Sequence, residues 1–172
     1  QPEKGAVPYL VSARDSWSMA IAAAAAGRLR RPLLVISGTT IPSVVTSYVK
    51  REVASTGVVG VGSVKLVPDA ALRTFKNPLR ATGTGPAALS TTLAASLPSA
   101  LRGTRLTLVA TGSGSVAQAV IAAARGQLLL VVDRASAELP TAVSAFLQGY
   151  RDVSVLDSVA TPVALVTRAR RV

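Results

Sequence analysis

The chain has 172 residues, of which 49% are hydrophobic and only 3% are aromatic, so its core must be built from Ala, Val and Leu. It carries 19 Lys and Arg against 8 Asp and Glu, a net charge of +11. This charge indicates either binding to polyanions such as nucleic acid, anionic lipid or acidic wall glycans, or simply a solubilising surface. Because the sequence contains neither cysteine nor histidine, it excludes disulfide bonds, thiolate metal sites and the usual general base of enzymes.

In chain order, the first half alternates apolar runs of strand length with helical segments. Its longest apolar helical run, residues 19–26, is far shorter than the ~18 residues of a membrane span. Such alternation predicts parallel strands joined by right-handed helical crossovers. The predicted elements are strands at 7–11, 32–36 and 57–62, and helices at 17–26, 41–54 and 68–75.

The second half repeats the same order of elements. Pro140 matches Pro42, and both prolines stand where the first turn of a helix tolerates a missing N–H group. The leucines at 33–34 match those at 128–129. The predicted elements are strands at 106–110, 128–132 and 152–156, and helices at 115–125 and 139–147.

Residues 76–104 join the two copies and contain one further helix at 86–97. After the second copy, residues 162–167 predict an extra strand, and the basic tail at 168–171 is expected to be solvated. The sequence therefore predicts an α/β protein of two tandem Rossmann-like three-layer modules with parallel sheets. The modules are expected at residues 1–79 and 80–172.

Ligands of open parallel sheets favour the crevice beyond the carboxyl ends of the strands. The loops there contain polar and glycine residues, and Trp17 is either a platform for a sugar ring or an anchor that packs under its loop. Ser16 and Ser115 are expected to be helix N-caps. The candidate ligand-binding residues are Arg14, Asp15, Trp17, Thr39, Thr40, Gly112, Ser113, Ser115, Asp133 and Arg134.

One loop resembles a nucleotide site. Residues 112–117 read Gly-Ser-Gly-Ser-Val-Ala after a strand, and Asp133 ends the next strand, close to the dinucleotide fingerprint. The equivalent loop of the first copy, residues 14–17, has no glycine, and no substrate domain is evident. A nucleotide-binding protein is therefore kept as an alternative only.

The sequence shows no catalytic constellation, because its acids are scattered and no serine has a histidine to activate it. We expect no enzyme activity, no cofactor and no metal. The basic residues at 28–31 lie at the sheet end opposite the ligand loops and are interpreted as a solvated face. The lack of aromatic stacking platforms argues against nucleic acid as the partner.

The repeated motifs resemble the type 2 cell-wall-binding repeat of Gram-positive surface proteins. Residues 80–83 match its R-x-x-G start, and 31–34 and 127–130 match its Pro-x-Leu-Leu strand. Ile41-Pro42 and Leu139-Pro140 match its Leu-Pro element. The Arg-Tyr that usually follows R-x-x-G is replaced by Gly85-Pro86.

The resemblance implies non-covalent attachment of an exported, actinobacterial-type protein to an anionic cell-wall polymer outside the membrane. It also implies three modules around a pseudo-threefold axis, so an additional module or a homo-oligomer would complete the set of two. The departures from the family's pattern favour an alternative, a structural or assembly module that has lost its ligand.

Overall fold

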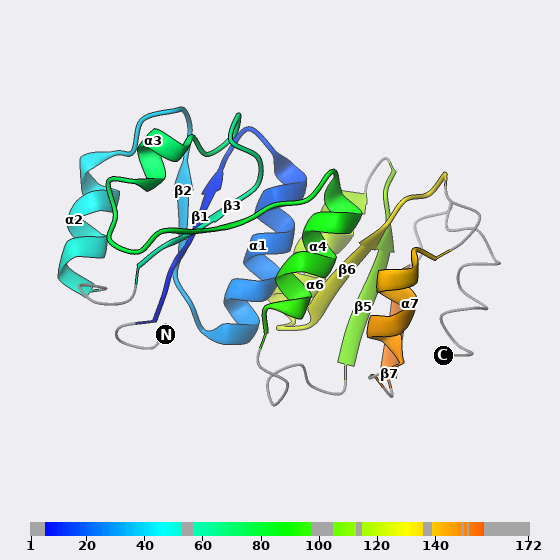
Figure 1. Cartoon of the computed structure of the whole chain (residues 1–172). Coiled ribbons are helices and arrows are strands. Elements are labelled where there is room, and N and C mark those ends of the chain that lie inside the picture. Colours follow the sequence, from blue (N-terminus) through cyan, green and yellow to red (C-terminus); the bar gives the residue numbers. More distant parts are fainter. Residues whose placement is uncertain are drawn as a thin grey trace.

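The computed structural model describes residues 6–52, 57–97, 105–112, 115–135, 139–148, 150 and 152–156. Two separate parallel sheets lie side by side along the length of the molecule, with helices around and between them (Figure 1). The predicted strand at 162–167, the tail at 168–171 and Ser113 lie outside the described residues. No helix in the described part of the chain is long and apolar enough to cross a membrane.

The first sheet has the strand order β2-β1-β3-β4, and all of its neighbouring strands are parallel. Each crossover passes through a helix, as the alternation of apolar runs predicts. The elements are β1 (Tyr9–Ser12), α1 (Ser16–Leu29), β2 (Leu33–Ile36), α2 (Ser43–Glu52), β3 (Val59–Val61), α3 (Asp69–Leu72) and β4 (Leu79–Ala81).

The second sheet has the order β6-β5-β7 and is also parallel. This order is the same as β2-β1-β3, which confirms that the two halves share one topology. Pro42 and Pro140 each stand directly before the first residue of a helix, at the same position in both halves and just before the first turn in which they were predicted. The elements are α4 (Pro86–Ala95), which precedes the sheet, then β5 (Arg105–Ala110), α6 (Ser115–Ala124), β6 (Leu128–Val132), α7 (Thr141–Leu147) and β7 (Asp152–Leu156).

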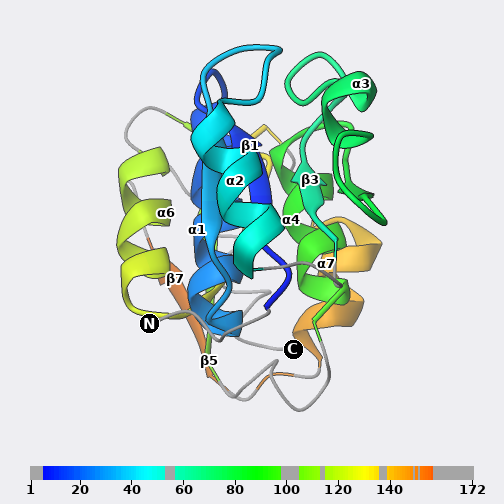
Figure 2. The ribbon, with the colours of Figure 1, turned by 90° about the vertical axis from the view of Figure 1, so that its left-hand side faces the viewer.

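Both sheets have helices on both faces, so each half has three layers, as predicted. In β1, Tyr9 and Val11 pack into the core formed with α1, whereas Leu10 between them packs into the core formed with α2. In β6, Val131 faces the α6 side and Leu130 faces the α7 side. Helices α6 and α7 accordingly lie on opposite sides of the molecule (Figure 2).

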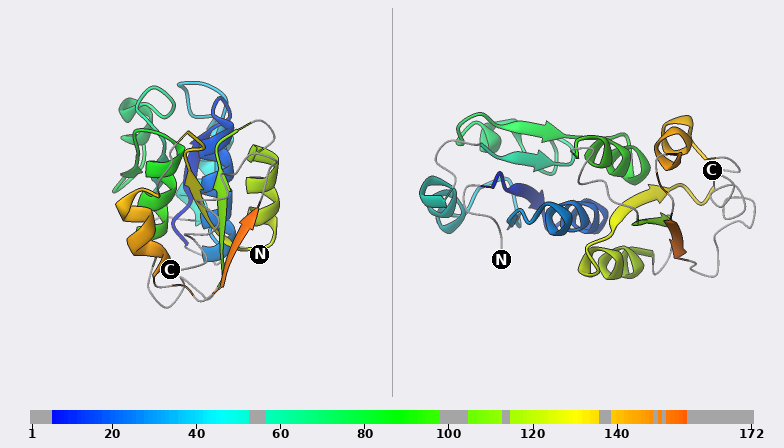
Figure 3. Two further views of the ribbon diagram at one scale, coloured as in Figure 1. Left: turned by 90° about the vertical axis from the view of Figure 1, so that its right-hand side faces the viewer. Right: turned by 90° about the horizontal axis from the view of Figure 1, so that it is seen from below.

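Helix α1 is the element that joins the two halves. It packs on β1 of its own sheet and also against α6, α4 and β6, and the view from below shows it between the two sheets (Figure 3). A helix enclosed in this way needs small side chains, because its neighbours must approach closely on several sides. Its buried residues are Ser18, Ala20, Ile21, Ala22, Ala24, Ala25 and Ala26.

Three sequence expectations were wrong at the level of single elements. Ser115 was expected to be a helix N-cap, but it is the first residue of α6 itself. Strand β4 lies in the segment predicted to be a linker, where it pairs with β3, so the linker begins by extending the first sheet. Asp15, not Ser16, caps α1, since its carboxylate accepts a hydrogen bond from Trp17 N at 3.2 Å. The module boundary after residue 79 remains a prediction, and β4 spans it.

Candidate functional site

The largest cavity described is a groove of about 970 Å³ at the carboxyl ends of the second sheet's strands. One wall is α4, and the others come from the start of α1, from the loops after β5 and β6, and from α7. Its volume is in the range of small-molecule sites, ~300–1,000 Å³. The lining residues are Trp17, Thr84, Gly85, Pro86, Ala87, Ala88, Thr91, Thr92, Ala95, Thr111, Asp133, Pro140 and Val143.

Trp17 is positioned by the N-terminal cap of α1. Asp15 Oδ1 accepts a hydrogen bond from Trp17 N at 3.2 Å, and Asp15 Oδ2 accepts one from Ser18 Oγ. Trp17 is half-buried and packs against the core around α1, so it also anchors the start of the helix. The backbone of Trp17 is therefore fixed at the start of α1, and the residue lines the groove.

Asp133 is fixed by the turn that follows β6. Its Oδ1 accepts hydrogen bonds from Thr111 Oγ1 at 3.2 Å and from Ala135 N at 3.1 Å. Thr111 Oγ1 in turn accepts a hydrogen bond from Arg134 N at 3.0 Å. Both bonds to Asp133 use the same oxygen, and its other oxygen can accept a hydrogen bond from a ligand hydroxyl.

A smaller cavity of about 240 Å³ lies on the other side of Trp17. It shares Trp17 and residues 84–86 with the groove, so the indole and the start of α4 separate the two spaces. Its remaining lining residues come from the cap and first turn of α1, the β3–α3 loop, the β4–α4 loop and α4: Asp15, Ser18, Gly62, Ser63, Leu66, Gly83 and Leu89.

The arginine of the R-x-x-G motif holds the β3–α3 loop beside the smaller cavity. Arg80 Nη1 donates to Gly62 O at 2.9 Å, and Nη2 donates to Val67 O at 2.5 Å and to Asp69 Oδ1 at 2.7 Å. The Arg80 side chain is only 17% exposed, and its guanidinium group donates to these three oxygens within the protein. Arg80 therefore has a structural role, because both terminal nitrogens of its guanidinium group already donate to oxygens of the protein.

The glycine of the same motif, Gly83, lets the backbone of the β4–α4 loop pack directly against the backbone of α4. A Cβ atom on Gly83 would lie 2.3 Å from Leu89 N and 2.7 Å from Ala88 C, both backbone atoms of the helix. No side chain fits in that space. The two fixed positions of R-x-x-G thus shape the wall between the β4–α4 loop and the smaller cavity.

The structure brings some of the candidate residues together and separates others. Trp17 and Asp133 line the groove, and Asp15 lines the smaller cavity. The other described candidates line none of the described cavities. Arg14 Nε donates to Ser37 O at 3.1 Å. Thr39 and Thr40 are exposed in the same loop as Ser37. Gly112 and Arg134 are exposed after β5 and β6. Ser115 is the first residue of α6, and its side chain is outside the described part.

The residues that sequence reasoning missed are those of α4. Their place depends on a contact between distant segments, since Ser90 Oγ accepts a hydrogen bond from Val131 N of β6 at 2.9 Å. The sequence signal that could have found them is the pair Thr91-Thr92 on a helix opened by Gly85-Pro86. Among the described residues, no group of three or more acidic side chains is placed to hold a metal ion.

The predicted basic cluster at 28–31 lies at the other end of the first sheet. The Arg31 guanidinium carbon is 5.5 Å from the centroid of the Tyr9 ring. Burial raises the pKa of Tyr9 above its usual value, while the charge of Arg31 and hydrogen bonds to Ser96 and Arg31 lower it in part. Arg31 thus contributes to packing at the start of β1.

The chain has the fold of a region of Cwp8 from Clostridium difficile. The TM-score is 0.81 at 17% identity, over 98% of this chain and 30% of Cwp8. Cwp6 from the same organism matches with a TM-score of 0.77 at 16% identity, over 95% of this chain and 27% of Cwp6. Both are cell wall proteins, and the chain spans less than a third of either. No protein-family model matches the chain, and neither does any curated protein sequence.

Proposed function

We propose that this chain is a non-catalytic module that attaches an exported protein to anionic polymers of the cell wall. The fold that it shares with Cwp8 and Cwp6 supports a role at the cell wall. The motifs at 80–83, 31–34 and 139–140 support kinship with the type 2 cell-wall-binding repeat. The absence of histidine and cysteine from the sequence supports binding without catalysis.

The observation that carries the proposal is the groove beside Trp17. An indole provides a flat apolar surface for the face of a sugar ring, and the groove adds the carboxylate of Asp133 and the hydroxyls of several threonines. These polar groups can form hydrogen bonds with sugar hydroxyls. Because the groove runs along α4, it can hold a stretch of polymer.

The charge distribution supports an anionic polymer as the ligand. The four carboxylates with described side chains are all engaged within the protein. Glu52 pairs with Arg51, Asp69 pairs with Arg80, and Asp15 and Asp133 accept backbone N–H groups. The sequence as a whole has a net charge of +11, which attracts polyanions, and pairs between exposed charges are screened by salt.

We expect the protein to be retained on purified cell walls at low ionic strength and released as salt is raised to about 0.5 M, where the screening length falls to a few ångströms. Walls stripped of their anionic polymers should retain much less protein. A sedimentation assay on the two wall preparations measures both effects. Equal retention on stripped walls would contradict the proposal.

Blocking the groove should reduce binding without disturbing the core. Thr92 is exposed on α4 and lines the groove, so Thr92→Trp should fill the space and lower the affinity for walls by roughly tenfold. Thr82 is also exposed but lines neither cavity, and Thr82→Trp is the matched control. If both variants bind walls as well as the wild type, the polymer binds elsewhere.

A specific observation supports a second candidate function, an assembly module. Ile36 and Val132 accept equivalent hydrogen bonds from Ala13 N and Thr111 N, so Val35 of β2 matches Val131 of β6. The edge of β6 is covered by α4, and Val131 is 0% exposed. Val35, in the equivalent place, is 43% exposed. The edge of β2 therefore lacks the cover that its counterpart has.

The partner for this edge would be another unit of the same architecture. Helix α6 also exposes Val120 and Ile121, whereas α1, its counterpart, is buried between its neighbours. An additional module of the parent protein or a second copy of the chain would bury both surfaces. Such head-to-tail contacts close into a ring when the rotation permits.

We expect Val35→Lys to lower the mass of the particle in solution, because a lysine cannot be buried unpaired in an apolar interface. Val44→Lys on α2 is the control, since Val44 is 72% exposed and lies on a helix, away from the edge strand β2. Sedimentation equilibrium measures the mass. A wild-type chain that is monomeric at all concentrations would contradict self-assembly.

A further inference from the structure

A third cavity lies at the other end of the first sheet from the groove. It has a volume of about 250 Å³ and opens between α2 and the segment that leads into β4. Gly57, directly before β3, forms part of its lining. The cavity is smaller than a site for a drug-sized ligand, ~300–1,000 Å³, so its volume suits one ring-sized group.

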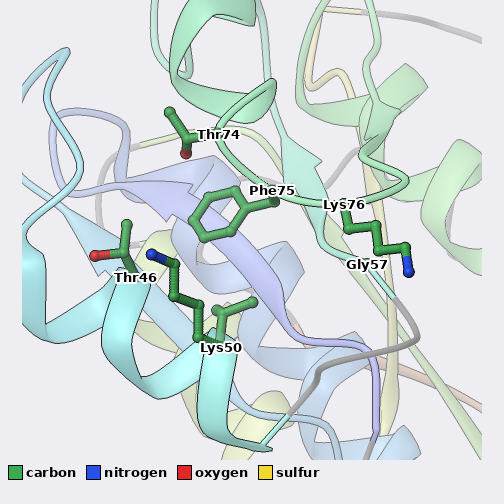
Figure 4. A pocket seen from close by; sticks show the side chains of 7 residues that line it. Thr46, Lys50, Gly57, Thr74, Phe75 and Lys76 are labelled. Carbon is green, nitrogen blue, oxygen red and sulfur yellow. The ribbon is translucent and has the colours of Figure 1, made fainter.

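Lysines from two separate segments border this cavity. Lys50 comes from α2 and Lys76 from the segment after α3, and both are exposed. Figure 4 shows Lys50 extending toward the ring of Phe75, with Lys76 on the other side of that ring. By contrast, the residues that line the groove include Asp133 and no lysine or arginine.

The other polar side chains that line the cavity are those of Thr46 and Thr74. Thr46 Oγ1 donates its proton to Ser43 O at 2.9 Å, and Thr74 Oγ1 donates to Ala71 O at 2.7 Å. The lone pairs of the two hydroxyl oxygens can therefore accept hydrogen bonds from ligand hydroxyls. Phe75 and Val49 supply an apolar surface beside them.

The position of Lys76 is fixed by close backbone packing. A Cβ atom on Gly57 would lie 2.9 Å from Lys76 O and 2.3 Å from Asn77 O, and Gly57 has a φ of +81°. Only glycine is compatible with both constraints. The backbone at Gly57 therefore packs directly against the segment that carries Lys76. Because of this packing, the mouth of the cavity is formed before any ligand binds.

We propose that this cavity binds a sugar residue that carries a carboxylate or a phosphate. Lys50 would pair with the anionic group, Lys76 would add positive potential, and the two threonine oxygens would accept hydrogen bonds from sugar hydroxyls. This inference rests on the proposed function, because it assigns the acidic groups of a wall polymer to a place separate from the groove.

The test is titration of the full chain with single sugars, followed by the amide signals in NMR spectra. Glucuronic acid and glucose 6-phosphate should each shift the signals of Thr46, Lys50 and residues 74–76. Glucose at the same concentration should shift them little. Shifts confined to other regions, or equal shifts with inorganic phosphate alone, would overturn the proposal.

A matched pair of variants separates a built site from general attraction. Lys50→Gln should weaken binding of glucuronic acid about fivefold, the effect expected for one partly screened charge. Lys65→Gln removes the same charge from an exposed residue that does not line the cavity and should change binding less than twofold. If the two variants weaken binding equally, the protein attracts glucuronic acid only through its overall charge, and the proposed site is wrong.

The two proposals can fail separately. One outcome is that the wild type and Lys50→Gln bind walls equally well and neither of them binds glucuronic acid or glucose 6-phosphate at millimolar concentration. This result would overturn the site and leave wall attachment standing. Binding of glucuronic acid at residues 46–50 and 74–76 without retention on walls would support the site and contradict wall attachment.

Discussion

Replacement of Gly83 by alanine is expected to lower the free energy of unfolding by about 3 kcal/mol, because overpacking against backbone cannot be relieved by a side-chain rotation. The new methyl carbon would lie 2.3 Å from Leu89 N and 2.8 Å from Leu89 Cα. Helix α4 must then move away, and its contact with β6 through Ser90 would weaken. Thermal unfolding followed by circular dichroism should show a midpoint lower by about 10 °C.

Gly85→Ala is the control for Gly83→Ala. Gly85 is two residues away at the N-cap of α4, and a Cβ atom there would meet nothing within 4 Å. Its φ of −178° is extended and open to any residue. The control should cost at most about 1 kcal/mol, the preference for glycine over alanine at an N-cap. Equal losses in the two variants would show that the close approach at Gly83 is unimportant.

The periodic pattern of the sequence predicted the fold well. Apolar runs such as 33–36 and 128–132 lie in β2 and β6, and both halves have the same strand order. The repeat was decisive, because each copy supported the interpretation of the other. Strands that are covered on both faces consist of continuous apolar residues, and such runs are easy to recognise in a sequence.

Strand β4 and the place of α4 were harder to predict. Only three residues form β4, of which Leu79 is 65% exposed, so no apolar run marks it. It is a strand because β3 offers an unpaired edge. Likewise, nothing local to residues 86–95 shows that Ser90 meets Val131, 41 residues away. Both features are set by tertiary contacts.

The candidate site was only partly predictable for the same reason. The rule that ligands lie beyond the carboxyl ends of parallel strands led to Trp17 and Asp133, which line one groove. That rule treats each half alone. The groove, however, lies where α4 from the linker meets both halves, so its main wall was missed.

The R-x-x-G motif shows how a family pattern can mark fold rather than ligand chemistry. Arg80 and Gly83 stand at the two ends of the motif, and both have structural contacts that explain them. Matching the motif therefore predicts the local path of the chain around the smaller cavity. It carries no information about the chemistry of a ligand.

Arg80→Ala is expected to cost about 3 kcal/mol of unfolding free energy. The variant leaves Gly62 O and Val67 O without their shared donor in a partly buried place, and unmet buried acceptors cost ~1–3 kcal/mol each. Urea unfolding measures the loss. Arg73→Ala removes an exposed arginine nearby and should stay within about 0.5 kcal/mol of the wild type.

A further variant separates the two kinds of contact that Arg80 makes. Asp69 is 56% exposed, so Asp69→Asn should cost only about 0.5 kcal/mol, the usual value of an exposed ion pair. Amide hydrogen exchange should become faster across residues 62–69 in Arg80→Ala and stay unchanged in β6, since only the β3–α3 loop loses its clamp. If Asp69→Asn matches Arg80→Ala in both measurements, the ion pair and not the carbonyl contacts holds this loop.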